Sequence, residues 1–120
     1  MSKPVIYTSY FANLRNVPSS IEPIAISLFV PNFYNGKRAI DLAPSKEILN
    51  SYKAGEINES EYKKMYLDLL ESRIVSIEDW LSYFEQHSVV LVCYEGKDKF
   101  CHRHILGELL EGLGFEVMEF

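Results

Sequence analysis

The stretch that decides the fold reads VVLVCYE at residues 89–95, GKDKF at 96–100 and CHRH at 101–104. Its first part is short, apolar and rich in β-branched residues, a composition typical of a buried strand. The Cys-His-Arg run opens a segment in which apolar residues recur every three or four positions, as on one face of a helix. We therefore expect a strand, a short loop and a helix, with Cys93 at the end of the strand and Cys101 at the start of the helix.

The rest of the chain alternates strands with helices. Predicted strands are rich in β-branched and aromatic residues, and predicted helices carry apolar residues on one face. Strands are expected at residues 5–11, 24–30, 89–94 and 115–120, and helices at 45–55, 58–70, 76–84 and 101–113. The nearly continuous apolar run at 24–30 suits a strand that is covered on both faces. This order indicates an α/β fold: a single compact domain over residues 1–120, with a mainly parallel sheet flanked by helices.

Length and composition narrow the classes of protein. The 120 residues suit one domain, and the net charge of −5 argues against non-specific nucleic-acid binding, which depends on neutralising phosphates. No apolar run approaches the roughly 20 residues that cross a bilayer. The N-terminal residues do not resemble a signal peptide, so we expect a cytoplasmic protein without a membrane partner. Two cysteines in that compartment are more often thiols than a disulfide. Cofactors and oligomeric state are left open.

The start of the last helix is predicted to bind a small anion. In a parallel sheet, ligands bind at the carboxyl ends of the strands, so we expect the site where Cys93 and Glu95 meet this helix. Free backbone N–H groups at a helix start attract negative charge. Arg103 supplies donors suited to phosphate or carboxylate, and Lys97 and Lys99 make the loop locally basic. The sequence therefore predicts a pocket for a small anionic ligand.

The same helix start carries a candidate nucleophile. A thiol at a helix start beside Arg and Lys side chains favours the thiolate form, which points to Cys101. On a helical wheel His102 points inward, Arg103 lies at the border of the apolar face and His104 points to solvent. We therefore expect Cys101 to act as the catalytic nucleophile, with His102 and Glu95 handling protons.

Further ligand contacts are expected from Cys93 and Arg103 and from the end of the first strand. Tyr7, Ser9 and Tyr10 lie at that strand end, on the same edge of the predicted sheet. We expect these three residues to line the pocket, with Tyr7 and Ser9 as ligand contacts. The alternative is that they are ordinary residues of the strand.

The other site residues also have purely structural explanations. Cys93 suits a core as a small hydrophobe, and His102 can be a hydrogen-bonded core histidine. Glu95 can cap the helix or pair with Arg103. Cys101 is the hardest to explain by packing, because Ser, Thr, Asp or Asn caps a helix better.

Two further interpretations use the same side chains. Four residues are of zinc-ligand type, namely Cys93, Glu95, Cys101 and His102, although their spacing matches no standard zinc motif. Cys93 and Cys101 are also close enough in sequence to form a redox pair.

A strand ending in Cys-x-Glu (residues 93–95), followed by Cys-His-Arg (residues 101–103) at a helix start, resembles the C-terminal signature of the domain-of-unknown-function family numbered 488. The segment 41–45, together with Tyr62 and Tyr66, is similar to that family's middle region. The resemblance implies a compact α/β domain, usually found in bacteria, archaea or their phages, and it brings no established activity.

The first strand shows one departure from that family. Its end at residues 7–9 looks like a variant of the family's first strand end, and the commoner Gly-His-Ser ending is replaced by Ser9-Tyr10-Phe11.

Three functions remain open at this point. One is an enzyme acting on a nucleotide, a modified base or another phosphate-bearing small molecule. The second is a non-catalytic module that binds a nucleotide or anion in the same place. The third is an accessory protein, for instance in phage–host conflict, with exposed aromatic residues and Phe120 forming an interface.

Overall fold

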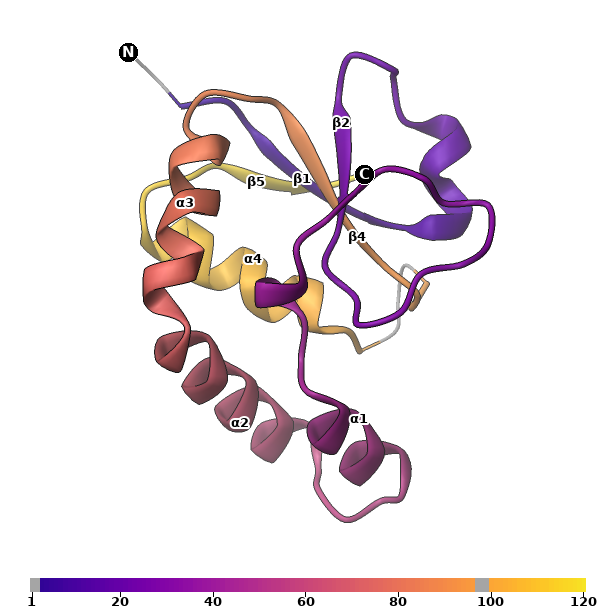
Figure 1. Cartoon of the computed structure of the whole chain (residues 1–120), viewed down its shortest axis with the longest axis vertical. Coiled ribbons are helices and arrows are strands. Elements are labelled where there is room, and N and C mark those ends of the chain that lie inside the picture. Colours follow the sequence, from indigo (N-terminus) through magenta and orange to yellow (C-terminus); the bar gives the residue numbers. More distant parts are fainter. Residues whose placement is uncertain (1–2, 97–99) are drawn as a thin grey trace.

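In the computed structural model, which describes residues 3–96 and 100–120, the strands form one five-stranded parallel sheet in the order β3-β2-β4-β1-β5 (Figure 1). The strands are β1 (Ile6–Tyr10), β2 (Glu22–Ala25), β3 (Lys37–Arg38), β4 (Val89–Cys93) and β5 (Val117–Glu119). The prediction of an α/β fold with a mainly parallel sheet is confirmed.

The central strand β4 organises the core, because its five residues are all buried. Alternation along the strand sends Val89, Leu91 and Cys93 into the larger core, on the side of the α-helices. Val90 and Val92 pack into a smaller core on the opposite face. The continuous apolar character of this strand therefore reflects burial on both faces.

The α-helices are α1 (Lys46–Lys53), α2 (Glu59–Ser72), α3 (Ile74–Phe84) and α4 (His102–Gly112). Helix α4 packs directly on β1, β4 and β5, while α2 contacts α1, α3 and α4 (Figure 1). The 3-10 helix η1 (Phe11–Asn16) and the chain around Tyr34 contribute side chains to the core on the opposite face of the sheet. A second 3-10 helix, η2 (Ile40–Leu42), leads into α1.

The helix starts show where local sequence decides structure. The side chain of Ser45 accepts a hydrogen bond from the N–H of Ile48 at the start of α1. At the start of α2, Asn58 and Glu61 form the predicted capping box. The predicted start of α3 at residue 76 is wrong, because α3 already begins at Ile74.

A tertiary contact sets the boundary between α2 and α3. Arg73 lies between the two helices, and its guanidinium donates to the carbonyls of Ala43, Asp41 and Ile40. This contact fixes the break at Arg73. Helix α3 therefore begins at this break, before the box-like sequence at residues 76–79.

The predicted strand at residues 24–30 is also wrong beyond Ala25. The ladder ends where the N–H of Ile26 donates to the carbonyl of Val92 at 3.0 Å, one residue before β4 itself ends. Among the residues that the structure describes, no further strand lies beside the chain beyond Ile26, and Phe29 is 62% exposed. The apolar run therefore reflects burial up to Ile26, followed by an irregular segment.

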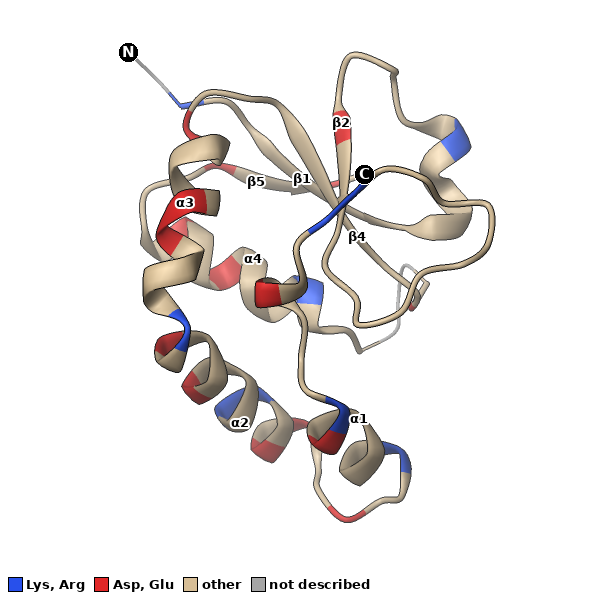
Figure 2. Cartoon of the chain, in the orientation of Figure 1, with Lys and Arg blue, Asp and Glu red and all other residues tan. Residues whose placement is uncertain are grey.

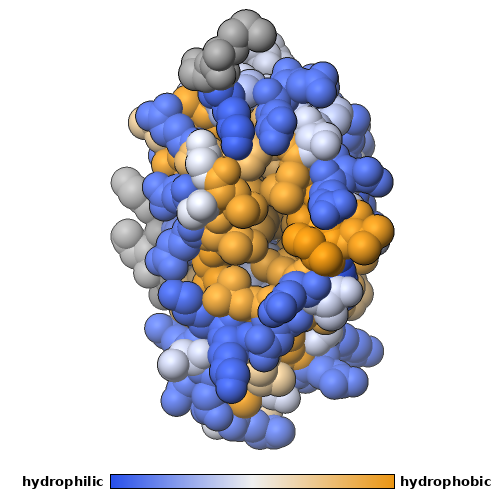
Figure 3. Space-filling model, turned by 90° about the vertical axis from the view of Figure 1, so that its left-hand side faces the viewer, coloured by the Kyte–Doolittle hydropathy of each residue, from blue (hydrophilic) through white to orange (hydrophobic). Residues whose placement is uncertain are grey.

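Helices α2, α3 and α4 enclose an apolar groove, visible as the hollow in Figure 3. Its walls are leucines and isoleucines from all three helices, including Leu67, Ile77 and Leu109. No helix in the described part of the chain has both the length and the apolar character to traverse a bilayer.

Candidate functional site

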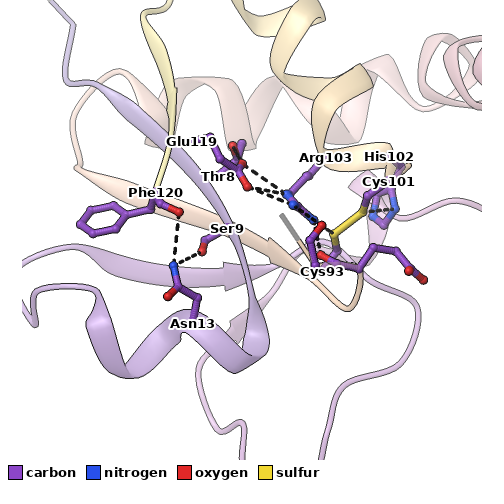
Figure 4. A network of polar contacts seen from close by, with 11 residues as sticks. Thr8, Ser9, Asn13, Cys93, Cys101, His102, Arg103, Glu119 and Phe120 are labelled. Carbon is purple, nitrogen blue, oxygen red and sulfur yellow. Dashed lines mark hydrogen bonds and ion pairs between the residues drawn. A yellow bond between two sulfur atoms is a disulfide. The ribbon is translucent and has the colours of Figure 1, made fainter. Parts of the chain in front are cut away.

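The end of β4 and the start of α4 bring the predicted residues together. Cys93 is the last residue of β4, and Cys101 is the N-cap of α4. Both are buried, and their sulfur atoms are joined in a disulfide (Figure 4). Nη1 of Arg103 donates to the Cys93 sulfur at 3.1 Å. The two sulfurs and the guanidinium therefore converge at one edge of the sheet.

The disulfide differs from the two thiols expected for this chain. It forms because the end of β4 lies beside the start of α4, which places the two cysteines against each other. Their Cα atoms are 7.5 Å apart, wider than the roughly 4.4–6.8 Å of most disulfides. This wider spacing also suits a reduced pair of thiols held side by side.

His102 presents a lone pair to the sulfurs. Its Nε2 lies 2.6 Å from the carbonyl oxygen of Ile26, and because a carbonyl only accepts, Nε2 carries the proton. Burial is the main cause that lowers the pKa of His102 to about 4, so the ring is neutral at pH 7. Nδ1 is then unprotonated, and it lies 3.7 Å from the sulfur of Cys101. The ring of Tyr66 packs edge-on against this imidazole. His102 is thus placed to accept a proton from Cys101.

Arg103 is completely buried, and protein acceptors occupy its guanidinium. It forms an ion pair with Glu119, with 2.9 Å between Nη2 and Oε2. It also donates to the carbonyls of Glu95 at 2.6 Å and Gly96 at 3.1 Å. The ring of Tyr10 lies 5.7 Å from the guanidinium carbon. Arg103 therefore ties the loop after β4 to the last strand.

A cavity of about 640 Å³ borders the sulfurs, within the range of small-molecule sites. Cys93, Cys101 and His102 line it, as does Glu95, whose exposed side chain belongs to its rim. The remaining wall comes from α1, α2 and the irregular segment after β2, and includes the ring of Phe100. Arg103 is not among the lining residues that the structure describes.

The structure places Tyr7 and Ser9 apart from this cavity. Tyr7 packs on the other face of the sheet, where its ring meets Phe120 at 5.3 Å. Ser9 is buried and accepts a hydrogen bond from Asn13, turned away from the sulfurs (Figure 4). Phe120 is only partly exposed.

Two residues close to Arg103 were not predicted: Thr8 and Glu119. The hydroxyl of Thr8 donates to Glu119, which in turn holds Arg103. Alternation along β1 provided a clue, because the inward position of Ile6 also turns Thr8 and Tyr10 toward the helices. Glu119 had no such clue in the sequence, because its pairing with Arg103 depends on how β5 joins the sheet.

Predictions were also made for two loop lysines and for His104. Lys97 and Lys99 lie outside the described residues. His104 is exposed, as the helical wheel predicts. Elsewhere, Lys and Arg are interspersed with Asp and Glu along α1 and α2 (Figure 2).

The same side chains have the composition of a metal site. One ligand atom from each of Cys93, Cys101 and His102 lies within 4.8 Å of the others. Two thiolates and a neutral imidazole are a donor set suited to zinc, with a fourth position left for water or substrate. The hydrogen bond from His102 to the carbonyl of Ile26 is the kind of outer contact that orients a zinc-bound histidine.

Fold and site together define a small α/β protein with a cysteine pair and a histidine at the carboxyl edge of a parallel sheet. A family model described as "Active DUF488-N3 subclade" matches residues 17–114, and the chain belongs to this family. No curated protein and no solved structure matches the chain.

Proposed function

We propose that this chain is a thiol-dependent enzyme that acts on a small molecule bound in the cavity, with Cys101 as nucleophile and His102 as general base. The observation that carries the proposal is the contact between the unprotonated Nδ1 of His102 and the sulfur of Cys101. A nucleophile beside an oriented base, at the wall of a cavity, is the arrangement that thiol catalysis requires. The description of the family as an active subclade agrees with this proposal.

In the reduced protein the chemistry runs in two steps. The sulfur of Cys101 attacks an electrophilic carbon of the ligand while its proton passes to Nδ1 of His102, so the neutral imidazole acts as a general base during the attack. A carbon–sulfur bond forms, the bond to the leaving group breaks, and His102 returns the proton to the leaving group. Water then attacks the same carbon and gives a proton to His102, which passes it to the departing sulfur of Cys101. The net reaction is hydrolysis, and it needs neither an oxidant nor a reductant.

Arg103 positions the nucleophile in this scheme, and Cys93 can block it. Arg103 donates to the Cys93 sulfur and to the carbonyls that follow it, so it holds the end of β4 against α4. A disulfide with Cys93 blocks Cys101, so the enzyme is active only when reduced.

The ligand proposed here is a nucleotide or another phosphate-bearing small molecule. The cavity reaches the start of α4, where no side chain caps the backbone N–H groups, and the dipole of the helix attracts negative charge there. Lys53 adds an exposed ammonium group to the wall. Arg103 is not an argument for an anionic ligand, because Glu119 already neutralises its charge.

The test uses p-nitrophenyl acetate as a general electrophile, on protein that has been reduced and treated with a chelator. We expect a burst of p-nitrophenolate followed by slow turnover, because Cys101 is acetylated first. Cys101→Ser should abolish the burst, and His102→Asn should slow it by about 10²-fold. Cys93→Ser is the matched control and should keep the burst. An equal burst from Cys101→Ser would contradict the proposal.

Zinc binding is a second candidate, favoured by the compact grouping of Cys93, Cys101 and His102. These three side chains would hold the ion, which would supply a Lewis acid facing the cavity. Protein purified under reducing conditions without chelator should then contain about one zinc per chain, and His102→Asn should lose it. A metal content near zero in the wild type would eliminate this candidate and leave the thiol enzyme.

A further inference from the structure

We propose that the cavity selects a flat aromatic heterocycle, with Tyr52, Tyr62 and Phe100 contacting the ring and the hydroxyl of Ser27 bonding to its polar edge. The inference rests on the proposed function, because it names the class of molecule presented to Cys101. A nucleobase is the natural member of this class, since it combines a planar ring with hydrogen-bonding groups along one edge.

Three rings from distant parts of the sequence meet at the cavity wall. Tyr52 belongs to α1, Tyr62 to α2, and Phe100 immediately precedes α4. Their centroids are 5.0 Å apart for Tyr62 and Phe100, 5.2 Å for Tyr52 and Phe100, and 5.3 Å for Tyr52 and Tyr62. Tyr62 is buried, whereas Tyr52 and Phe100 keep partly exposed surface. Such a cluster offers ring faces and edges to a planar ligand, which a stack of aliphatic side chains does not.

Ser27 supplies the polar contact. The residue is 5% exposed and belongs to the wall of the same cavity. Within the described part of the chain its Oγ has no hydrogen-bond partner, although a buried hydroxyl normally has one. A donor or acceptor on a ligand would therefore satisfy a group that the folded chain leaves unpaired.

The position of Ser27 connects this contact to the chemistry. Ser27 follows Ile26, whose carbonyl accepts the proton of His102 Nε2. The hydroxyl proposed to bond to the ring edge belongs to Ser27, and the carbonyl that orients His102 belongs to the adjacent residue Ile26. Lys53 and Glu95, both exposed, line the same cavity, so a polar substituent of the ring can point toward solvent past them.

The experiment measures ligand binding to the reduced wild-type protein by saturation-transfer NMR. The first probes are benzamide and cyclohexanecarboxamide, which share a carboxamide and differ in ring flatness. The second set is adenosine and cytidine, with ribose as the control that lacks a base. We expect binding of benzamide and of at least one nucleoside, and no binding of cyclohexanecarboxamide or ribose. Equal binding of the two carboxamides would overturn the inference.

Variants then test the named residues. Ser27→Ala should weaken binding of the best ring probe about five- to tenfold, by loss of one hydrogen bond. Tyr52→Leu and Phe100→Leu should each weaken it about tenfold, by loss of ring contacts. Phe33→Leu, which removes an exposed ring outside this cavity, is the matched control and should bind as the wild type does.

A stability measurement separates ligand recognition from a structural role of Ser27. Because its hydroxyl is unpaired, Ser27→Ala should leave the melting temperature unchanged or raise it. A large drop in melting temperature would show that the hydroxyl serves the fold, and it would overturn the inference.

Failure of this inference is distinguishable from failure of the proposed function. Cys101→Ser should keep ring binding while losing the p-nitrophenolate burst. A burst without ring selectivity overturns only the inference. Ring selectivity without a burst overturns only the thiol chemistry.

Discussion

At the scale of single residues, the site depends on two buried polar side chains whose orientation is fixed by hydrogen bonds. His102 is held neutral, with its proton on Nε2, by the carbonyl of Ile26. Arg103 is held in place by its ion pair with Glu119. Burial of either group alone would be costly, so the surrounding backbone acceptors are part of the site.

Removal of the guanidinium should cost much of the stability of the protein. Arg103→Met leaves Glu119 without its cation and the carbonyls of Glu95 and Gly96 without this donor, and we expect a loss of about 2–4 kcal/mol in the free energy of unfolding. Urea denaturation measures it. Lys64→Met, at an exposed position of α2, is the control and should change stability by less than about 0.5 kcal/mol. A loss of the same small size for Arg103→Met would contradict the account of a buried guanidinium that binds Glu119 and two backbone carbonyls.

His102 should make the protein less stable as the pH falls below about 6.5. Its pKa is 6.5 when unfolded and about 4 when folded, so the unfolded state binds the proton more tightly. The contribution of neutral His102 to the free energy of unfolding is complete above pH 6.5. It is lost as the pH falls toward 4, and the loss reaches about 3 kcal/mol at pH 4. Urea denaturation of the reduced, metal-free wild type and of His102→Gln across this range measures the effect. Parallel curves for the two proteins would show that His102 does not titrate as described.

At the scale of elements, the helix starts divide into two kinds. Those of α1 and α2 have the side-chain caps that their sequences predict, at Ser45 and Asn58. The start of α4 has Cys101 in the same position, and its side chain caps nothing. Cys101 therefore does not stabilise the helix start as a cap, and its thiol faces His102. This combination fits a chemical role of Cys101 better than a structural one.

This contrast predicts the effect of a serine at that position. Under reducing conditions Cys101→Ser should leave stability unchanged or raise it by up to about 1 kcal/mol, because a serine hydroxyl can bond to the free N–H groups of α4. Thermal unfolding in the presence of a reductant measures it. Asn58→Ala is the reference, and it should lose about 1 kcal/mol with the capping box of α2. A clear destabilisation by Cys101→Ser would mean that the sulfur serves packing.

The elements that local sequence controls were predictable, and those that depend on distant partners were not. The strand β4, the capped helices α1 and α2, and the start of α4 at Cys101 all follow from patterns within a few residues. The early end of β2 depends on where β4 ends, and the start of α3 depends on Arg73 binding carbonyls near η2. Such contacts leave no trace in the local pattern.

At the scale of the whole molecule, the parallel sheet assembles the site from both halves of the chain. Order β2-β4-β1 places the ends of three strands side by side, and α4 returns across them (Figure 1). The meeting of Cys93, Cys101, His102 and Arg103 was predictable, because these residues flank one loop. Ser27 and Glu119 were not, because their places depend on β2 and β5 pairing with distant strands. The expectation for Tyr7 and Ser9 rested on the shared sheet edge alone, and it did not take into account that side chains alternate between the two faces of a strand.

The central claim is that Cys101, when reduced, is a nucleophile served by the neutral His102. It is tested most directly by the rate at which iodoacetamide alkylates Cys101 at pH 7 in reduced, metal-free protein, followed by peptide mass spectrometry. We predict that the wild type reacts at least about tenfold faster than His102→Asn, with Cys93→Ser close to the wild type. Equal alkylation rates in the wild type and His102→Asn would contradict the account.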